Sequence, residues 1–182
     1  MKPYQPEGLW QEVAMLQSNT REYARGNGDD LYRRSLYTYW KRACPPPTML
    51  TLDAPTRESC TIRRATTNTP LQALVLWNDV QFVEASRALA ARTLTDGGDE
   101  PARITRLFER CATRAPEADE LALLTAALAE FRARYQAARE AAGLLIGVGE
   151  SKPPAELDPV ELAAWTMLAN AVLNLDAVIT RG

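Results

Sequence analysis

The sequence predicts an all-α or mainly α protein, with a helical, bundle-like C-terminal two thirds and a loop-rich, partly extended N-terminal third. Beyond residue 69, apolar side chains recur at helical spacing, as at Ile104, Leu107 and Phe108. Prolines and glycines interrupt the N-terminal third instead. At 182 residues and 46% hydrophobic content, the chain can bury one core, so we expect a single domain in which a loop-rich segment 1–68 precedes a helical part 69–182.

Only short elements are expected in the segment 1–68. Residues 9–17 predict a short helix. Residues 33–42 alternate in residue types that favour strands, and they predict a strand. The three prolines at 45–47 favour an extended, polyproline-like chain, and residues 49–52 predict a second extended piece.

The helical part begins with a strong local signal. Thr69 is placed to cap a helix whose first residue is Pro70, where the missing N–H costs nothing. An apolar stripe continues to Thr95, and Asp79 is expected to cap a second helix after a break.

Further helices are expected to open at Pro101, at Pro116 and at Asp158. Asp158 and Glu161 have the spacing of a capping box, and Trp165 lies in the apolar stripe of the last helix. We therefore assign structural roles to Asn68, Thr69, Pro70 and Trp165.

Several chemistries are excluded by residue type. The chain contains no histidine, so it can neither ligate c-type haem nor use histidine in catalysis, and no cofactor is expected in it. Its three cysteines lack metal-site spacing, so no metal site is expected either. Cys44 and Cys60 are either small buried residues or a disulfide across the proline-rich loop. No apolar run is long enough to span a membrane, and the N-terminus has no signal-peptide pattern.

Positive charge and aromatic rings gather in one stretch. The net charge of the chain is −2, but residues 31–64 contain seven basic residues against Asp53 and Glu58. Arginine forks beside aromatic faces suit sulfated, carboxylated or phosphorylated ligands, acidic glycans included. The predicted ligand-binding residues are Arg33, Arg34, Tyr37, Tyr39, Trp40, Arg57, Arg63 and Arg64.

Ligand binding is one of several interpretations of this basic and aromatic stretch. The arginines can instead pair with buried carboxylates and carbonyls and so pin a region that lacks regular hydrogen bonds. We expect Arg63 and Arg64 to be structural, and Arg33 and Arg57 to be accessible. Asp53 and Glu58 are expected to have structural roles by neutralising Arg57 or Arg63. As a pair of acids they also allow, as the alternative, part of a polysaccharide hydrolase whose other carboxylates come from upstream sequence. The acidic second half of the chain opposes nucleic-acid binding.

The same stretch resembles a known family. The resemblance is carried by Tyr32–Arg42, Pro45–Pro47, Asp53–Cys60, Arg63–Arg64 and Thr67–Leu74, with Lys2–Pro6 and Glu161–Asp176 in support. These runs are similar to the planctomycete cytochrome-c-associated domain of unknown function, which ends large exported proteins. Val80 departs from the family, which usually has proline there. The family domain begins upstream of the Lys2–Pro6 run, so the chain resembles the C-terminal part of a larger domain.

The resemblance implies a place for the chain in a larger protein. Its parent would be periplasmic, cell-surface or secreted, any haem would belong to an upstream domain, and the upstream domains would be its partners. Together with the residue types, this predicts a non-catalytic structural or ligand-binding module.

Overall fold

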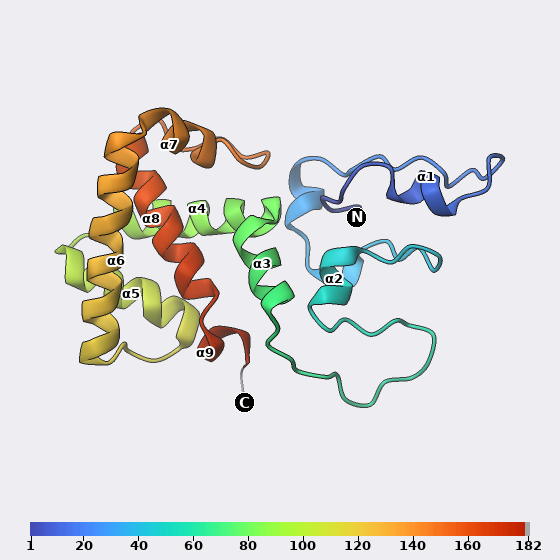
Figure 1. Cartoon of the computed structure of the whole chain (residues 1–182), viewed down its shortest axis with the longest axis horizontal. Helices are drawn as coiled ribbons and strands as arrows, with labels where there is room; N and C mark the ends of the chain where they lie inside the picture. Colours follow the sequence, from blue (N-terminus) through green and yellow to red (C-terminus); the bar gives the residue numbers. More distant parts are fainter. Residues whose placement is uncertain (181–182) are drawn as a thin grey trace. The chain divides into compact units, whose positions relative to one another are not determined.

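The computed structural model describes residues 1–180, which contain helices and no β-strand. This confirms the predicted all-α class. The chain forms two compact units, one spanning Met1–Thr67 and one beginning at Asn68 (Figure 1). The division falls beside the expected boundary between the loop-rich segment and the helical part. That the whole chain is one domain stays a prediction.

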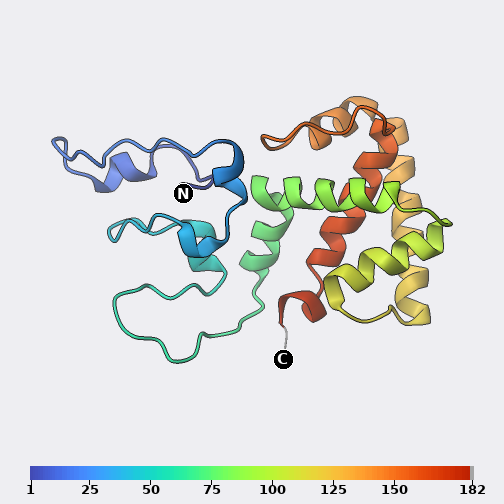
Figure 2. The same ribbon diagram turned by 180° about the vertical axis from the view of Figure 1, so that it is seen from behind.

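The first unit has few regular elements. These are α1 (Leu9–Val13), the 3-10 helices η1 (Gly28–Tyr32) and η2 (Ser35–Tyr37), and α2 (Pro47–Thr51). Irregular chain joins them, and residues after α2 form a wide loop that both views show (Figures 1 and 2).

The first helix is shorter than the predicted span 9–17. It ends at Val13, because Ala14 already has extended dihedral angles, and Gly8 at its start provides no side-chain cap. Met15 and Leu16 are 85% and 80% exposed, so no burial favours a longer helix there.

The predicted strand at 33–42 is wrong. A strand needs a neighbour to satisfy its backbone, and residues 1–180 offer no other strand. The chain turns through η2 instead, and the N–H of Tyr39 donates to the Met1 carbonyl at 2.8 Å. Leu36, expected on the same face as Thr38, is 73% exposed, whereas Thr38 is buried.

The extended piece predicted at 49–52 is also wrong, because helix α2 begins at Pro47. Proline is favoured as the first residue of a helix, since its fixed φ suits the helix and its missing N–H has no partner there. The last proline of the triplet therefore starts a helix, and Pro46 before it has a φ of −58° and a ψ of 120°, outside the helical region.

The second unit is a helical assembly. Its helices are α3 (Pro70–Asn78), α4 (Val80–Thr95), α5 (Glu100–Ala112), α6 (Ala118–Ala137), α7 (Arg139–Ile146), α8 (Pro159–Leu173) and α9 (Asp176–Ile179). Helices α4, α6 and α7 pack on α8, which runs through the middle of the unit (Figures 1 and 2). A helix buried on nearly all sides is expected to be largely apolar, and α8 is so apart from Glu161, Thr166 and Asn170. None of the helices in residues 1–180 is long and apolar enough to cross a membrane.

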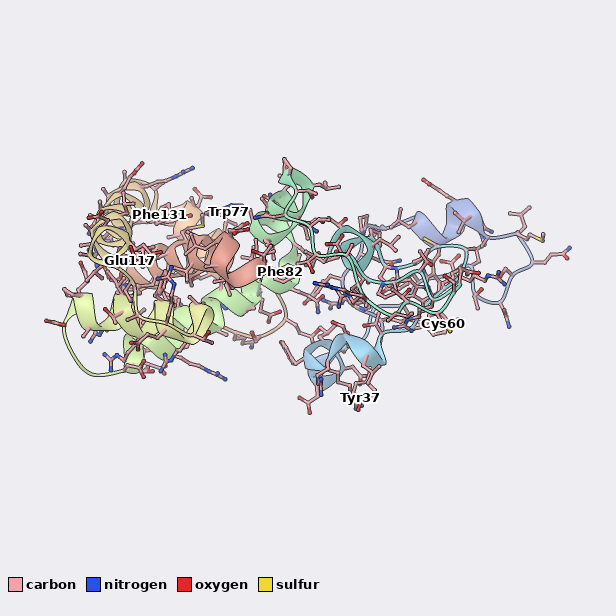
Figure 3. All side chains as sticks on the ribbon, turned by 90° about the horizontal axis from the view of Figure 1, so that it is seen from below. Tyr37, Cys60, Trp77, Phe82, Glu117 and Phe131 are labelled. Atoms are coloured by element: carbon pink, nitrogen blue, oxygen red, sulfur yellow. The ribbon has the colours of Figure 1, made fainter. Side chains whose placement is uncertain are left out.

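The core of the second unit lies around Trp165, which is 1% exposed. Phe108 from α5, Leu128 from α6 and Leu168 from α8 are fully buried in the same cluster. Phe131 of α6 packs against this cluster and is labelled in Figure 3. Trp165 is thus a core residue, as its place in the apolar stripe predicted.

The predicted caps of α3 and α4 are present. Thr69 forms a capping box with Gln72, and Pro70 is the first residue of α3. Asp79 ends α3 and caps α4 by accepting the N–H of Gln81, so the break is present with Val80 as the first residue of α4. The helix expected from Pro116 begins two residues later, with Glu117 as its cap.

The capping box predicted at Asp158 forms only in part. Asp158 accepts the N–H groups of Val160 and Glu161, both at 3.0 Å. The Glu161 carboxylate does not reach back to the cap; it pairs with Arg132 of α6, which also binds Glu100 of α5 at 2.7 Å. This ion-pair fork joins three helices and raises the pKa of Arg132, chiefly through its hydrogen bond to Glu161.

Asparagine side chains connect α3 to the last helices. Asn170 and Asn174 of α8 donate to the carbonyls of Leu76 and Ala73, at 3.2 and 3.3 Å. Asn68, predicted to be structural, donates to Asp176 at the start of α9 at 2.7 Å. These bonds hold the start of the second unit against its end.

Candidate functional site

The predicted ligand-binding residues lie in three places of the first unit. Arg33, Arg34 and Tyr37 are exposed around η1 and η2, and Tyr39 joins an aromatic cluster. Trp40, Arg57, Arg63 and Arg64 belong to the wide loop or contact it. Figure 3 shows the side chain of Tyr37 well away from Cys60 of that loop. The structure therefore does not gather all eight residues at one point.

The wide loop, residues 53–67, is closed at its base, and we call it the clamped loop. The Asp53 carboxylate accepts the N–H of Thr67 at 2.8 Å and its hydroxyl at 2.8 and 3.0 Å. Arg64 donates to the carbonyls of Leu52 and Asp53 at 3.0 and 3.2 Å. A surface loop whose ends meet in this way is an Ω-loop, a class that often carries function. Arg64 has a structural role in this clamp.

Two contacts fix the first half of the clamped loop to the preceding chain. The Arg57 guanidinium lies 4.6 Å from the centroid of the Trp40 ring, within the range of a cation–π contact. Arg42 binds Glu58 through both arms of its fork, at 2.8 and 2.7 Å. Glu58 thus neutralises Arg42 rather than Arg57 or Arg63.

The carboxylates in and near this stretch are too few to pair with all of its arginines. Within residues 31–64 the only two carboxylates are engaged by the Thr67 clamp and by Arg42, and Arg33 pairs with Asp30 at 3.0 Å. Arg34, Arg57 and Arg63 are exposed and have no carboxylate partner in the part of the chain that the structure describes. Three guanidinium groups therefore keep an uncompensated positive charge.

Tyr39 contacts an aromatic cluster of the first unit rather than the loop, and it remains 46% exposed. Its ring centroid lies 5.7 Å from that of Trp10, which in turn contacts Tyr23 at 4.8 Å. The ammonium groups of Lys2 and Lys41 lie 5.0 and 4.4 Å from the Trp10 ring. Sequence reasoning missed this cluster, since its members come from four distant segments that no periodicity connects.

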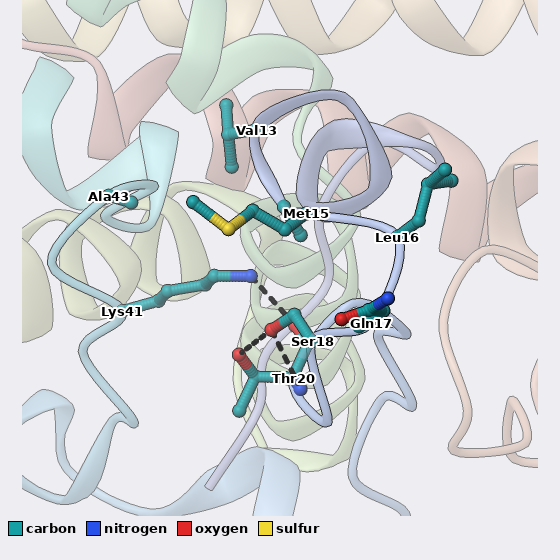
Figure 4. A pocket seen from close by; sticks show the side chains of 9 residues that line it. Val13, Met15, Leu16, Gln17, Ser18, Thr20, Lys41 and Ala43 are labelled. Atoms are coloured by element: carbon teal, nitrogen blue, oxygen red, sulfur yellow. Dashed lines mark hydrogen bonds between the residues drawn. The ribbon is translucent and has the colours of Figure 1, made fainter.

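An apolar hollow lies beside the chain after α1. It has a volume of about 820 Å³, and Val13, Met15 and Leu16 form much of its wall (Figure 4). Its one charged lining residue, Lys41, donates to the Thr20 carbonyl at 2.7 Å. Chemically the hollow suits an apolar group.

A second, smaller hollow has polar walls. Its volume is about 520 Å³, and it is lined by Tyr4, Gln5, Glu7, Gly8, Gln11, Tyr23 and Arg25. The Tyr23 hydroxyl donates to the Pro3 carbonyl at 2.5 Å, and burial raises the pKa of Tyr23 to about 12. No motif or periodicity in the sequence indicates either hollow.

Asp53 and Glu58, the acids of the hydrolase alternative, both have partners: Asp53 binds Thr67 at the base of the loop, and Glu58 binds Arg42 of the preceding chain. Residues 1–180 contain no group of three or more His, Cys, Asp or Glu side chains placed to hold a metal ion. The three cysteines are free, so the disulfide considered for Cys44 and Cys60 is not formed, and Cys60 is exposed.

Fold and site together define an all-α protein with a helical unit and a smaller, loop-rich unit that carries exposed arginines. The profile of a family described as Protein of unknown function (DUF1553), PSD1, matches residues 1–128. Because this match covers well over half of the 182 residues, the chain belongs to that family. The match includes the whole clamped loop and ends within α6. Comparison with curated proteins and with solved structures finds no match.

Proposed function

We propose that the first unit is a non-catalytic module that binds acidic polysaccharide through Arg57 and Arg63 of the clamped loop and through Arg34 at the start of η2. The observation that carries this proposal is the charge left at Arg34, Arg57 and Arg63 after the nearby carboxylates have found partners. Sulfate and carboxylate groups match the guanidinium fork, and a polymer presents them repeatedly.

Preorganisation of Arg57 favours binding. Its contact with Trp40 restricts a side chain that otherwise loses rotamer freedom on binding, so less ordering is left for the ligand to impose. Each exposed charge-assisted contact is weak on its own. Three of them support a Kd on the order of 0.1 mM for one stretch of polymer.

A titration panel tests the proposal. Dextran sulfate and polygalacturonate are titrated into the protein beside neutral dextran and random-sequence duplex DNA. We expect the sulfated or the uronic polymer to bind at least tenfold more tightly than neutral dextran, with the difference vanishing at high salt. Duplex DNA binding as tightly as the acidic polymers would make the site a general polyanion surface and contradict the proposal.

Single variants connect binding to the loop. Arg63→Met should weaken binding of the acidic polymer several-fold while leaving the melting temperature nearly unchanged, because the Arg63 side chain is exposed. The matched control is Arg139→Met, which removes one exposed charge from the second unit. Equal losses in both variants would show that net charge alone is responsible.

The wider context is also a proposal. The resemblance supports a module of an exported, cytochrome-c-associated planctomycete protein, with its upstream domains as partners. An antibody against this chain should then detect a large haem-staining protein in the periplasmic or cell-surface fraction. Detection only in the cytoplasm, without haem staining, would contradict this placement.

A further inference from the structure

The apolar hollow after α1 is walled by some of the most exposed apolar side chains of the protein. Met15 and Leu16 are 85% and 80% exposed, and among the large apolar side chains of residues 1–180 only Ile62 is more exposed. The volume of the hollow, about 820 Å³, lies within the usual range for small-molecule sites, roughly 300–1,000 Å³. Apolar side chains that gather around a concave surface in this way mark a binding site rather than scattered exposure.

The chain that presents these side chains is ordered by its own hydrogen bonds. The N–H of Ser18 donates to the Met15 carbonyl at 2.9 Å, and the N–H of Thr20 donates to the Ser18 hydroxyl at 3.3 Å. Lys41 fastens the end of this turn by donating to the Thr20 carbonyl at 2.7 Å. The wall is therefore largely formed before a ligand arrives, which lowers the entropy cost of binding.

One positive charge stands among the apolar walls. Figure 4 shows the Lys41 side chain pointing between Met15 and Ser18. Its ammonium group binds the Thr20 carbonyl and lies 4.4 Å from the centroid of the Trp10 ring. Neither partner is an anion, so the charge has no carboxylate counterpart in the part of the chain that the structure describes. An ammonium group has three N–H donors, and the Thr20 carbonyl takes one of them.

We infer that this hollow binds a single-chain alkyl carboxylate of the fatty-acid type. Its carboxylate accepts a hydrogen bond from the Lys41 ammonium, and its chain lies along Val13, Met15 and Leu16. Methionine suits this role, because its flexible, polarizable side chain adapts to chains of different shape. The site shares no residue with the clamped loop, and it takes a different ligand class from the proposed polysaccharide site.

The test titrates hexanoate, octanoate and decanoate into the full chain by calorimetry, each below its micelle concentration. Decanoate should bind saturably. Affinity should rise by roughly two- to fourfold for each methylene that the hollow covers, because each one removes apolar surface from water. Decylammonium has the same chain and the opposite charge, so it should bind at least tenfold more weakly than decanoate.

Two variants separate the chain contact from the charge contact. Leu16→Ser should weaken decanoate binding at least fivefold without lowering the melting temperature, since this side chain is 80% exposed. Lys41→Gln keeps a hydrogen-bond donor but removes the charge, so it should abolish the preference for decanoate over decylammonium. The matched control is Leu36→Ser, which alters a leucine that is 73% exposed and lies outside the hollow. It should leave decanoate binding unchanged.

The two proposed sites can fail independently. Arg63→Met should leave decanoate binding unchanged, and Leu16→Ser should leave dextran sulfate binding unchanged. The inference is overturned by an absence of saturable decanoate binding, by an affinity that does not grow with chain length, or by equal affinities of wild type and Leu16→Ser. Binding to phosphatidylglycerol vesicles without binding of free decanoate would also overturn it, and would make this wall a membrane-contacting surface instead.

Discussion

The guanidinium of Arg57 lies 4.6 Å from the ring centroid of Trp40, and this contact fixes an otherwise exposed loop to the chain before it. Arg57 has a φ of 63°, in the left-handed region that side chains other than glycine rarely adopt. The cation–π contact with Trp40 is an attraction that opposes the cost of this conformation. It also presents a cation that has no carboxylate partner in residues 1–180.

Removing the ring should loosen the clamped loop. In Trp40→Leu the cation–π contact is lost, which costs about 0.5–1 kcal/mol at an exposed site. We expect trypsin to cleave faster after Arg57 and Arg63, as measured by mass spectrometry. We also expect dextran sulfate to bind more weakly. Tyr37→Leu is the control, since it alters an exposed aromatic residue elsewhere in the unit. Unchanged cleavage in Trp40→Leu would show that the contact does not order the loop.

The base of the loop should depend on Asp53. Asp53→Ala removes the bonds to Thr67 and places alanine at a φ of 59°, so we expect the first unit to lose about 1–3 kcal/mol of stability in urea denaturation. Asp53→Asn tolerates the same backbone and keeps one acceptor, and it should lose less. Equal losses in the two variants would argue against the clamp.

Gly149 is expected to tolerate no side chain. It has a φ of 95°, and a Cβ there would overlap the carboxyl group of Glu84, which accepts the N–H of Ser151 at 2.6 Å. Arg87 is buried beside this pair and donates to the Val148 and Ser151 carbonyls. Gly149→Ala should cost at least about 2 kcal/mol in urea denaturation of the second unit.

The control for Gly149 is Gly97→Ala. No atom lies within 4 Å of the position of a Cβ at Gly97, so the substitution should change stability by less than about 0.5 kcal/mol. If both alanine variants are equally stable, the loop after α7 does not depend on this packing.

Acid should weaken the start of α6. The pKa of Glu120 is lowered from 4.5 to about 2, because Arg114 donates to its carboxylate twice at 2.7 Å and the Glu117 N–H once at 2.8 Å. A depressed pKa means that this contribution to stability is present above about pH 4.5 and is lost as the pH falls toward 2.

Glu120→Gln should therefore lose less stability than the wild type over that pH window, as measured by thermal melts at stepped pH. Glu130→Gln, at an exposed position further along α6, is the control and should follow the wild type. A steeper acid loss in Glu120→Gln than in the wild type would reverse the assigned sign.

Local signals predicted the second unit well. The cap at Thr69, the proline at Pro70 and the recapping at Asp79 depend on neighbours in sequence, and all three are present. The ion-pair fork at Arg132 depends on two other helices, so no local pattern reveals that Glu161 leaves its capping box.

Prediction was poorer where the first unit depends on distant contacts. Alternation at 33–42 suggested a strand, but alternation specifies a strand only where a neighbouring strand exists. The arginines predicted to share one site form separate groups, because their partners are residues distant in sequence that only the fold brings near. Arg64 binds carbonyls, whereas Arg63, which was also expected to be structural, is exposed and has no carboxylate partner in residues 1–180.

The salt dependence of dextran sulfate binding decides whether Arg34, Arg57 and Arg63 bind the acidic polymer. Calorimetric titrations at several salt concentrations compare the wild type, a variant with Arg34, Arg57 and Arg63 all replaced by methionine, and the Arg139→Met control. We predict that the triple variant loses at least tenfold in affinity and that its log K falls less steeply with log salt, because fewer counterions are released. A triple variant with the affinity and salt slope of the wild type would contradict the account.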